Sequence, residues 1–314
     1  MIGPILFLIF VNDMSDLPLY GRLFLYADDA FLAYDGVDDV ENVRRMNEDL
    51  KMLHDYFTRN RLALNVSKTK YMHFHDSRKR LTRGLSVSLF GDTVEQVHEF
   101  CYLGVYLDSH LTWKRHVNHL CDKMSRLIGV IYRVRDEIPF YALRRLYFGL
   151  AHGHLMNMVS VWSNAPIAYL KRLQTLQNRI LKIIYRKPIL TPTVTLFSEH
   201  VEDILPIKGM QVLATCKFVK QSIQGSIHCN LLFPRQPGIE NSRDPYKLIR
   251  CRALTGWGLQ RIAFQGPTFY NNLPLEIRAT SSLCMFLRKL KSFLLQPVNL
   301  AHLLQFNLPW RALL

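Results

Sequence analysis

The sequence predicts an α+β chain, in which a small antiparallel sheet with packed helices is followed by a mainly helical rear part. Two short apolar runs, residues 23–27 and 30–34, flank a pair of adjacent acids, and this pattern is typical of a β-hairpin. Apolar residues recur at helical spacing from Val40 to Phe57, which predicts a helix packed under the sheet. From Leu170 to Tyr185 one helical face is apolar and the other basic.

The hairpin is the most informative stretch, because it presents two carboxylates at its tip. Asp28 and Asp29 suit a tight turn, and the aromatic and aliphatic runs beside them indicate buried strands. Adjacent carboxylates repel, so a buried pair requires a cation, and hard oxygen ligands suit Mg²⁺. Two-metal nucleotidyl transfer needs such acids. The alternative is a surface hairpin whose turn is acidic by chance.

Composition favours a folded intracellular protein. Apolar residues make up 49% of the 314 residues, and the six cysteines form no C-x-x-C pair, as expected of reduced thiols. The apolar run Ile5 to Val11 is about half as long as a membrane span. We therefore expect no membrane partner.

Charge is distributed unevenly along the chain. Residues 1–111 hold 12 basic and 16 acidic side chains, whereas residues 112–314 hold 28 basic and 9 acidic ones. The net charge of +15 therefore arises from the rear part. An acidic front with a metal-type site and a basic rear part favour an enzyme that binds a polyanion over a generally basic protein.

Tyr26-Ala27-Asp28-Asp29 between two apolar strands resembles the catalytic hairpin of reverse transcriptases of non-LTR (LINE-type) retrotransposons. Three further segments resemble the family and occur in its order. They are Gly3-Pro4 with the apolar segment up to Asp13, the Asn-x-x-Lys-Thr pattern of residues 65–69, and Tyr102-Leu103-Gly104, which resembles the primer grip.

The resemblance implies the C-terminal part of an RNA-directed DNA polymerase. Residues 1–110 would form part of the palm, residues 111–187 a helical thumb, and residues 188–314 a C-terminal region of helices and loops. Gly3-Pro4 matches the end of the family's Gln-Gly-x-x-x-Gly-Pro loop, so the fingers and the palm strand with the other metal-binding Asp would precede residue 1. The alternative is a catalytically inactive relic that only binds nucleic acid.

The resemblance also implies roles for individual residues. Asp28 would be a ligand of Mg²⁺ or Mn²⁺, and Asp29 a partial ligand or electrostatic partner, while Tyr26 and Ala27 would shape the floor beneath the primer end. Lys68 would neutralise triphosphate charge or protonate the leaving pyrophosphate, unless it is a solvated turn residue. The partners would be an RNA template, a DNA primer, deoxynucleoside triphosphates and the missing N-terminal half of the polymerase.

The rear part supplies candidate contacts to nucleic-acid phosphates, although a solvated charged face is nearly as good an interpretation of its helices. His116, His119 and Cys121 lack the spacing of a zinc site, so we expect these histidines to face phosphate or solvent. Residues 266–278 resemble a recurrent C-terminal segment of these retrotransposon polyproteins, and we assign them no chemistry. The candidate phosphate contacts are Lys114, Arg115, Lys171, Arg172, Arg179 and Lys182.

Overall fold

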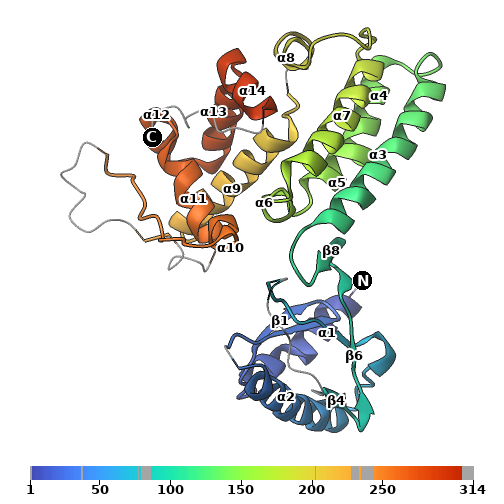
Figure 1. Cartoon of the computed structure of the whole chain (residues 1–314), viewed down its shortest axis with the longest axis vertical. Coiled ribbons are helices and arrows are strands. Elements are labelled where there is room, and N and C mark those ends of the chain that lie inside the picture. Colours follow the sequence, from blue (N-terminus) through green and yellow to red (C-terminus); the bar gives the residue numbers. More distant parts are fainter. Residues whose placement is uncertain are drawn as a thin grey trace. The chain divides into compact units, whose positions relative to one another are not determined.

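The computed structural model describes residues 2–36, 38–76, 78, 86–201, 203–227, 233–234 and 244–305. The chain forms two compact units, Met1–Phe100 with Asp108–Leu111 and Cys101–Leu107 with Thr112–Leu314. The first unit contains most of the strands and the second is mainly helical (Figure 1). The predicted α+β class is confirmed, whereas the division at residues 110 and 187 into palm, thumb and tail stays a prediction.

The first unit begins with a helix and a hairpin. The strands β1 (Arg22–Tyr26) and β2 (Asp29–Ala33) pair antiparallel, with Arg22 opposite Ala33 and Tyr26 opposite Asp29. The hairpin is therefore confirmed. The apolar segment before it forms α1 (Gly3–Phe10), with proline in its first turn, where a missing N–H is tolerated.

Helix α2 (Asp39–Arg59) follows the hairpin. The Asp38 side chain accepts a hydrogen bond from the Val40 N–H and so caps the helix as its sequence indicates. The predicted apolar stripe is only partly confirmed: Leu53 and Phe57 are buried, but Val40 is 52% exposed.

The remaining strands are short. Strand β3 (Lys70–Tyr71) pairs parallel with β6 (Glu95–Gln96), and β4 (Ser88–Leu89) pairs antiparallel with β5 (Asp92–Thr93). Strands β7 (Glu99–Tyr102) and β8 (Val105–Asp108) form a further pair. Instead of one sheet, the described residues therefore form four two-stranded sheets.

Two apolar clusters form the core of the first unit, and α2 contributes to both. One contains Val11, Met14, Leu53, Tyr56 and Phe57, and the other contains Val87, Leu89 and Val94. Half-buried Leu50 and Leu64 pack against both clusters. The hairpin contributes Leu23 and Leu32 to the first cluster.

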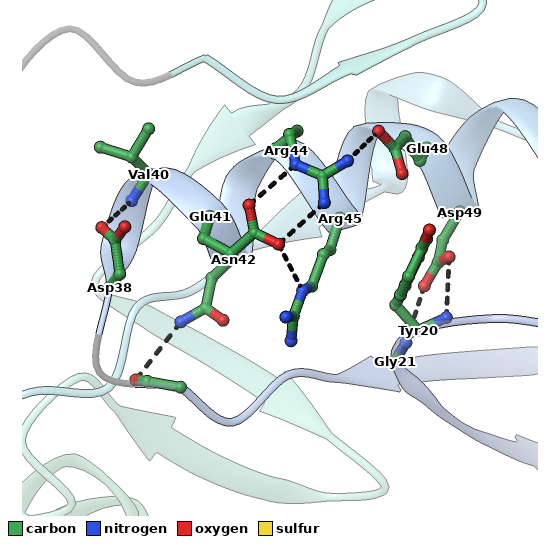
Figure 2. Close-up of polar contacts among 11 residues, drawn as sticks. Tyr20, Gly21, Asp38, Val40, Glu41, Asn42, Arg44, Arg45, Glu48 and Asp49 are labelled. Carbon is green, nitrogen blue, oxygen red and sulfur yellow. Dashed lines mark hydrogen bonds and ion pairs between the residues drawn. The ribbon is translucent and has the colours of Figure 1, made fainter.

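A buried carboxylate on α2 fixes the base of the hairpin (Figure 2). Asp49 is fully buried, and its two oxygens accept the N–H groups of Tyr20 at 3.0 Å and Gly21 at 2.8 Å. The Tyr34 hydroxyl donates to the same carboxylate at 2.8 Å. Because Tyr20 precedes β1 and Tyr34 follows β2, one side chain holds both ends of the hairpin.

The ring of Tyr34 leaves no space for a side chain at position 21. A Cβ atom on Gly21 would lie 2.7 Å from the Tyr34 ring, so glycine is required by this close approach. Burial, with the hydrogen bond to Asp49, raises the pKa of Tyr34 well above its usual value. The tyrosine therefore remains a hydrogen-bond donor at neutral pH.

Helices α3 (Lys114–Val134) and α7 (Ile167–Ile184) lie side by side in the second unit (Figure 1). They run in the same direction, because Arg172 contacts Asn118 near their starts and Arg186 contacts the Arg135 carbonyl beyond their ends. The elements between them are α4 (Phe140–Leu146), a π-helical turn (Tyr147–His152), α5 (Gly153–Met156) and α6 (Val159–Trp162).

The inner face of α7 is more polar than its sequence indicates. Leu170, Leu173 and Ile180 are buried as predicted, but Gln174 and Gln177 are buried too. The Gln177 amide donates to the Tyr147 hydroxyl and to the Leu205 carbonyl, each at 3.0 Å, and Gln174 accepts the Ile207 N–H at 2.8 Å. These bonds satisfy buried polar groups and attach the following segment to α7.

The tail is also helical and includes the basic and apolar helix α13 (Leu283–Leu295). None of the described helices is long and apolar enough to cross a membrane. The other tail elements are α8 (Thr193–Thr195), a π-helical turn (Leu196–His200), α9 (Ile207–Ile223), α10 (Gly256–Gln260), α11 (Ile262–Asn271), α12 (Leu275–Arg278) and α14 (Pro297–Leu304).

The segment 266–278, for which the sequence predicts no chemical role, contacts several other parts of the tail. A Cβ atom at Gly266 would lie 2.8 Å from Val219 of α9, so the glycine permits close packing of α11 on α9. Asn271 both donates to and accepts from the backbone of Leu248. The buried guanidinium of Arg278 forms two 2.8 Å bonds with Asp244. These contacts give the segment a structural role.

We predict that Asp49→Ala destabilises the first unit by about 3 kcal/mol, because two backbone N–H groups and a tyrosine hydroxyl lose a charged acceptor. Glu48→Ala is the matched control, since Glu48 pairs with Arg44 at the surface and its loss should cost less than about 1 kcal/mol. Urea unfolding followed by amide hydrogen exchange of residues 20–34 measures both. Unchanged protection of Tyr20 and Gly21 in Asp49→Ala would contradict the anchoring role.

Candidate functional site

The tip of the hairpin presents the two acids to solvent. Ala27 and Asp28 form the two-residue turn, Asp29 is the first residue of β2, and both carboxylates are exposed. Ala27 has a φ of +52°, a left-handed conformation that strains residues other than glycine. Such strain is typical of functional turns that the surrounding structure holds in place.

Two expectations for this tip were wrong. The turn is Ala27-Asp28 rather than Asp28-Asp29, because Asp29 pairs with Tyr26. The strands are not buried on both faces either, since β1 and β2 form an isolated pair whose outer residues Phe24 and Tyr26 are 51% and 63% exposed. Water therefore reaches both carboxylates, and their repulsion is weaker than in a buried pair.

The described residues do not complete a metal site at this tip. They contain no group of three or more His, Cys, Asp or Glu side chains that could hold a metal ion. Nearby acids are engaged elsewhere, because Asp13 accepts the Tyr56 hydroxyl at 2.5 Å and Asp35 pairs with Arg22 at 2.6 Å. Asp28 and Asp29 are oxygen ligands of the right chemistry for Mg²⁺, but they supply only part of a ligand set.

The first unit exposes a large amount of apolar surface on α1 and β1. Every residue of α1 is exposed, including Ile5 at 60% and Ile9 at 68%, although the sequence predicts a buried segment there. Phe24 and Tyr26 add exposed aromatic surface on β1. Apolar exposure on this scale marks an interaction surface, since soluble monomers rarely leave such patches open.

Lys68 lies in a short 3₁₀ turn that its own sequence stabilises. The Asn65 side chain accepts hydrogen bonds from the Ser67 hydroxyl at 2.7 Å and from the Lys68 N–H at 3.1 Å. Lys70 is paired with Glu95 at 2.5 Å, whereas Lys68 is exposed and has no carboxylate partner among the described residues. Of these two lysines, Lys68 is therefore the one available to a ligand.

The turn between β7 and β8 is held by the helical unit. Leu103 and Gly104 both have positive φ, +48° and +79°, as a tight hairpin turn requires. The Asn157 amide donates to the Leu103 carbonyl at 3.4 Å, and the Asn157 carbonyl accepts the Trp162 indole N–H at 2.8 Å. Asn157 carries no motif in the sequence, so this contact could not be predicted from it.

Strand β8 also packs on the start of α3. The Tyr106 ring lies between the Arg115 guanidinium, 5.3 Å from its centroid, and the His119 ring at 4.9 Å. The Tyr106 N–H donates to Nδ1 of His116 at 3.4 Å. The expectation that His116 faces phosphate or solvent was wrong: it is 1% exposed and its ring lies 5.5 Å from that of Trp162.

Most of the basic side chains of α3 and α7 that the sequence singles out are exposed. Lys114, Arg115, Lys171 and Arg179 are exposed. Arg172 is exposed too, and its guanidinium reaches Asn118 of α3 at 3.4 Å. The Lys182 ammonium instead donates to the Ile189 carbonyl at 2.6 Å, so this side chain binds the backbone that follows the C-terminal end of α7. Whether these residues contact nucleic acid stays a prediction.

The comparisons with known proteins agree with the hairpin motif. Residues 1–107 match the family model "Reverse transcriptase (RNA-dependent DNA polymerase)". The chain is 24% identical over 191 residues to a probable RNA-directed DNA polymerase from transposon X-element of Drosophila melanogaster. It is also 24% identical over 202 residues to the RNA-directed DNA polymerase from mobile element jockey of Drosophila funebris.

A third relative is the probable RNA-directed DNA polymerase from transposon BS of Drosophila melanogaster, 27% identical over 209 residues. The three alignments cover 59%, 60% and 62% of the chain, more than the family model does, so the similarity extends into the helical unit. The chain spans only 21–23% of the length of these relatives. No solved structure matches it significantly. The chain is thus similar to retrotransposon polymerases, with the family model placed on its front third.

Burial of His116 makes the helical unit acid-sensitive. Burial, reinforced by His119 and Lys123, lowers the pKa of His116 from 6.5 to about 4. The unfolded chain then binds more protons than the folded chain between these pH values, so stability is full above about pH 6.5 and falls as pH decreases toward 4.

The slope of the free energy of unfolding against pH between about pH 4 and 6.5 reports the titration of His116. We predict that His116→Asn, which keeps an acceptor for the Tyr106 N–H, lowers this slope by up to about 1.4 kcal/mol per pH unit. Urea unfolding followed by tryptophan fluorescence measures it, because Trp162 lies against His116. His154→Asn is the control at an exposed histidine and should change the slope less. Equal slopes for the wild type and His116→Asn would contradict the assignment.

Proposed function

We propose that this chain is the C-terminal part of the polymerase region of a non-LTR retrotransposon reverse transcriptase. In this proposal it provides half of a palm, a thumb and a tail for RNA-directed DNA synthesis. The observation that carries it is the match of residues 1–107 to the reverse transcriptase model, with the Tyr26-Ala27-Asp28-Asp29 hairpin inside that match. The similarity to three transposon polymerases supports the same assignment.

In this function the exposed hairpin tip supplies carboxylates to the reaction centre. Asp28 and Asp29 would bind Mg²⁺ or Mn²⁺, which in such enzymes stabilise the attacking and leaving oxygens of nucleotidyl transfer. Tyr26 and Ala27 would lie beneath the primer 3′ end. Lys68 would neutralise charge on the incoming deoxynucleoside triphosphate. The strained turn at Ala27 supports this role, because it fixes the direction of both carboxylates.

The rest of the ligand set would come from another part of the polymerase. The exposed apolar surface of α1 and β1 supports this proposal, because a segment packed on it would cover Ile5, Ile9 and Phe24. Within the part of the chain that the structure describes, no further strand pairs with β1 or β2, so a strand could add to the edge of either. A palm strand with an additional acid would meet both requirements.

The helical unit would hold the template–primer duplex. Exposed Lys171, Arg172 and Arg179 on α7 and Lys114 and Arg115 on α3 provide the cations that phosphate backbones require. The β7–β8 turn, bonded to Asn157, would contact the primer strand near Gly104. Such contacts position a duplex without reading its sequence.

A second function is nucleic-acid binding without catalysis. It is favoured by one observation: the described residues offer no third acid near Asp28 and Asp29. We therefore expect the chain by itself to bind nucleic acid and to lack polymerase activity.

Primer extension with a primed RNA template, Mg²⁺ and deoxynucleoside triphosphates tests the polymerase assignment. We predict no incorporation by the chain alone and incorporation by a longer polypeptide that adds the preceding polymerase segments. Asp28→Asn in the longer polypeptide should reduce the rate at least 100-fold, whereas Asp35→Asn, at a surface ion pair, should change it little. Incorporation that is unaffected by Asp28→Asn would reject the proposed role of the hairpin.

Binding of a labelled RNA–DNA duplex, measured by fluorescence anisotropy across a salt titration, tests the helical unit. We predict that the double variant Lys171→Ala with Arg172→Ala makes the slope of log K (the association constant) against log salt less steep by about 1 to 2. Each lost phosphate contact reduces the magnitude of this slope by about 0.9. Lys51→Ala with Arg59→Ala is the matched control, since it removes two exposed cations from the acidic first unit. An equal loss in both double variants would contradict an interface on α7.

A further inference from the structure

The tail contains a cavity that lies outside the site described above. It is shallow and open to solvent, has a volume of about 520 Å³, and is lined by Phe197, Ser198 and Asp203, by the second half of α13 and by the residue that precedes α14. A volume of this size accommodates a nucleotide or a short piece of nucleic-acid backbone. Its lining residues are Phe197, Ser198, Asp203, Arg288, Lys291, Ser292, Leu295 and Gln296.

The charge of this cavity is positive. Arg288 and Lys291 lie one helical turn apart on α13, and no ion pair joins either to an acid within the part of the chain that the structure describes. The lining carboxylate, Asp203, is already paired, because Arg144 donates to its Oδ2 at 2.6 Å. Arg288, Lys291 and Arg144 carry three positive charges and Asp203 carries one negative charge. The net charge of these four groups is therefore about +2, which complements a phosphate group.

Neutral hydrogen-bond donors complete the lining. Ser198 and Ser292 line the same cavity, and serine hydroxyls can donate hydrogen bonds. Helix α14 starts at Pro297, directly after lining residue Gln296, and no side chain caps its first turn. The N–H groups of Val298 and Asn299 therefore have no acceptor in their own helix, and the positive end of the helix dipole adds to the attraction of an anion.

Unpaired polar atoms accompany the cavity. Oδ1 of Asp203, Nε of Arg144 and Nδ1 of His152 are buried and have no hydrogen-bond partner among the described residues. His152 also feels the charges of both Lys291 and Asp203, so these groups form one electrostatic cluster. Of these three atoms only Oδ1 of Asp203 belongs to a residue that lines the cavity. It is an acceptor, so a bound water or a protonated phosphate oxygen, and not a bare anionic oxygen, would satisfy it.

We propose that this cavity binds a phosphate group of a nucleotide, with Arg288, Lys291, Ser198 and Ser292 as its contacts. The phosphate belongs to a nucleic-acid strand or to a free nucleotide, since both present the same oxygens. This site does not depend on the polymerase assignment, because none of its residues belongs to the hairpin or to the basic faces of α3 and α7. It gives the tail a nucleic-acid contact of its own.

The test uses the full chain and three probes: a labelled 12-nucleotide RNA and the same DNA, each without terminal phosphates, and inorganic phosphate. Arg288→Met with Lys291→Met keeps the length of both side chains and removes their charges. The matched control is Lys289→Met with Lys217→Met, because Lys289 is exposed on the same helix and Lys217 on α9, and neither lines the cavity. Thermal unfolding verifies that both double variants are folded.

We expect the cavity variant to bind the oligonucleotides at least tenfold more weakly and the control no more than threefold more weakly. If the cavity variant binds both RNA and DNA more weakly, the site holds a backbone phosphate. If inorganic phosphate shows phosphorus-31 line broadening with the wild type and not with the cavity variant, the site holds a free phosphate. Either result supports the site. Equal weakening in the two double variants, or no weakening in the cavity variant with any probe, overturns it.

Discussion

The geometry of the hairpin depends on the carboxylate of Asp49. This side chain accepts hydrogen bonds at the entry to β1 and at the exit from β2, so it fixes both strands to α2. A two-stranded sheet is marginal in water by itself. The hairpin also packs Leu23 and Leu32 against the core, but this apolar contact alone permits sliding. The directed bonds to Asp49 determine where along α2 the hairpin lies.

The local elements could be predicted from the sequence because their causes are local. The cap at Asp38, the proline at the start of α1 and the existence of the β1–β2 hairpin all follow from residues close in the chain, although the turn lies one residue earlier than expected. The tertiary contacts could not be predicted in this way. Asp49 stands beside Glu48 in an acidic stretch and resembles a solvated residue, yet it is fully buried. Asn157 and Gln177 likewise acquire their roles only when distant segments meet.

For the candidate site, the sequence predicted the hairpin and its acidic tip but not the exposure of its strands, and the chemistry of the tip stays a prediction. The tip does carry two carboxylates, but its strands are exposed where burial was expected. The apolar pattern of α1 predicted burial, whereas every residue of this helix is exposed in the described part of the chain. An apolar run such as that of α1 indicates that a segment is suited to packing against other residues, but it does not indicate which residues those are.

The backbone at Ala27 limits which residues can occupy the tip. With a φ of +52°, this position tolerates glycine, asparagine, aspartate and, at some cost, alanine. A β-branched or bulky residue would force a different turn, and a turn of different length would shift the strand pairing. Because side chains alternate across a strand, a shift of one residue would carry Asp29 to the opposite face. The small methyl group of Ala27 therefore helps to keep Asp29 on its own face of the hairpin.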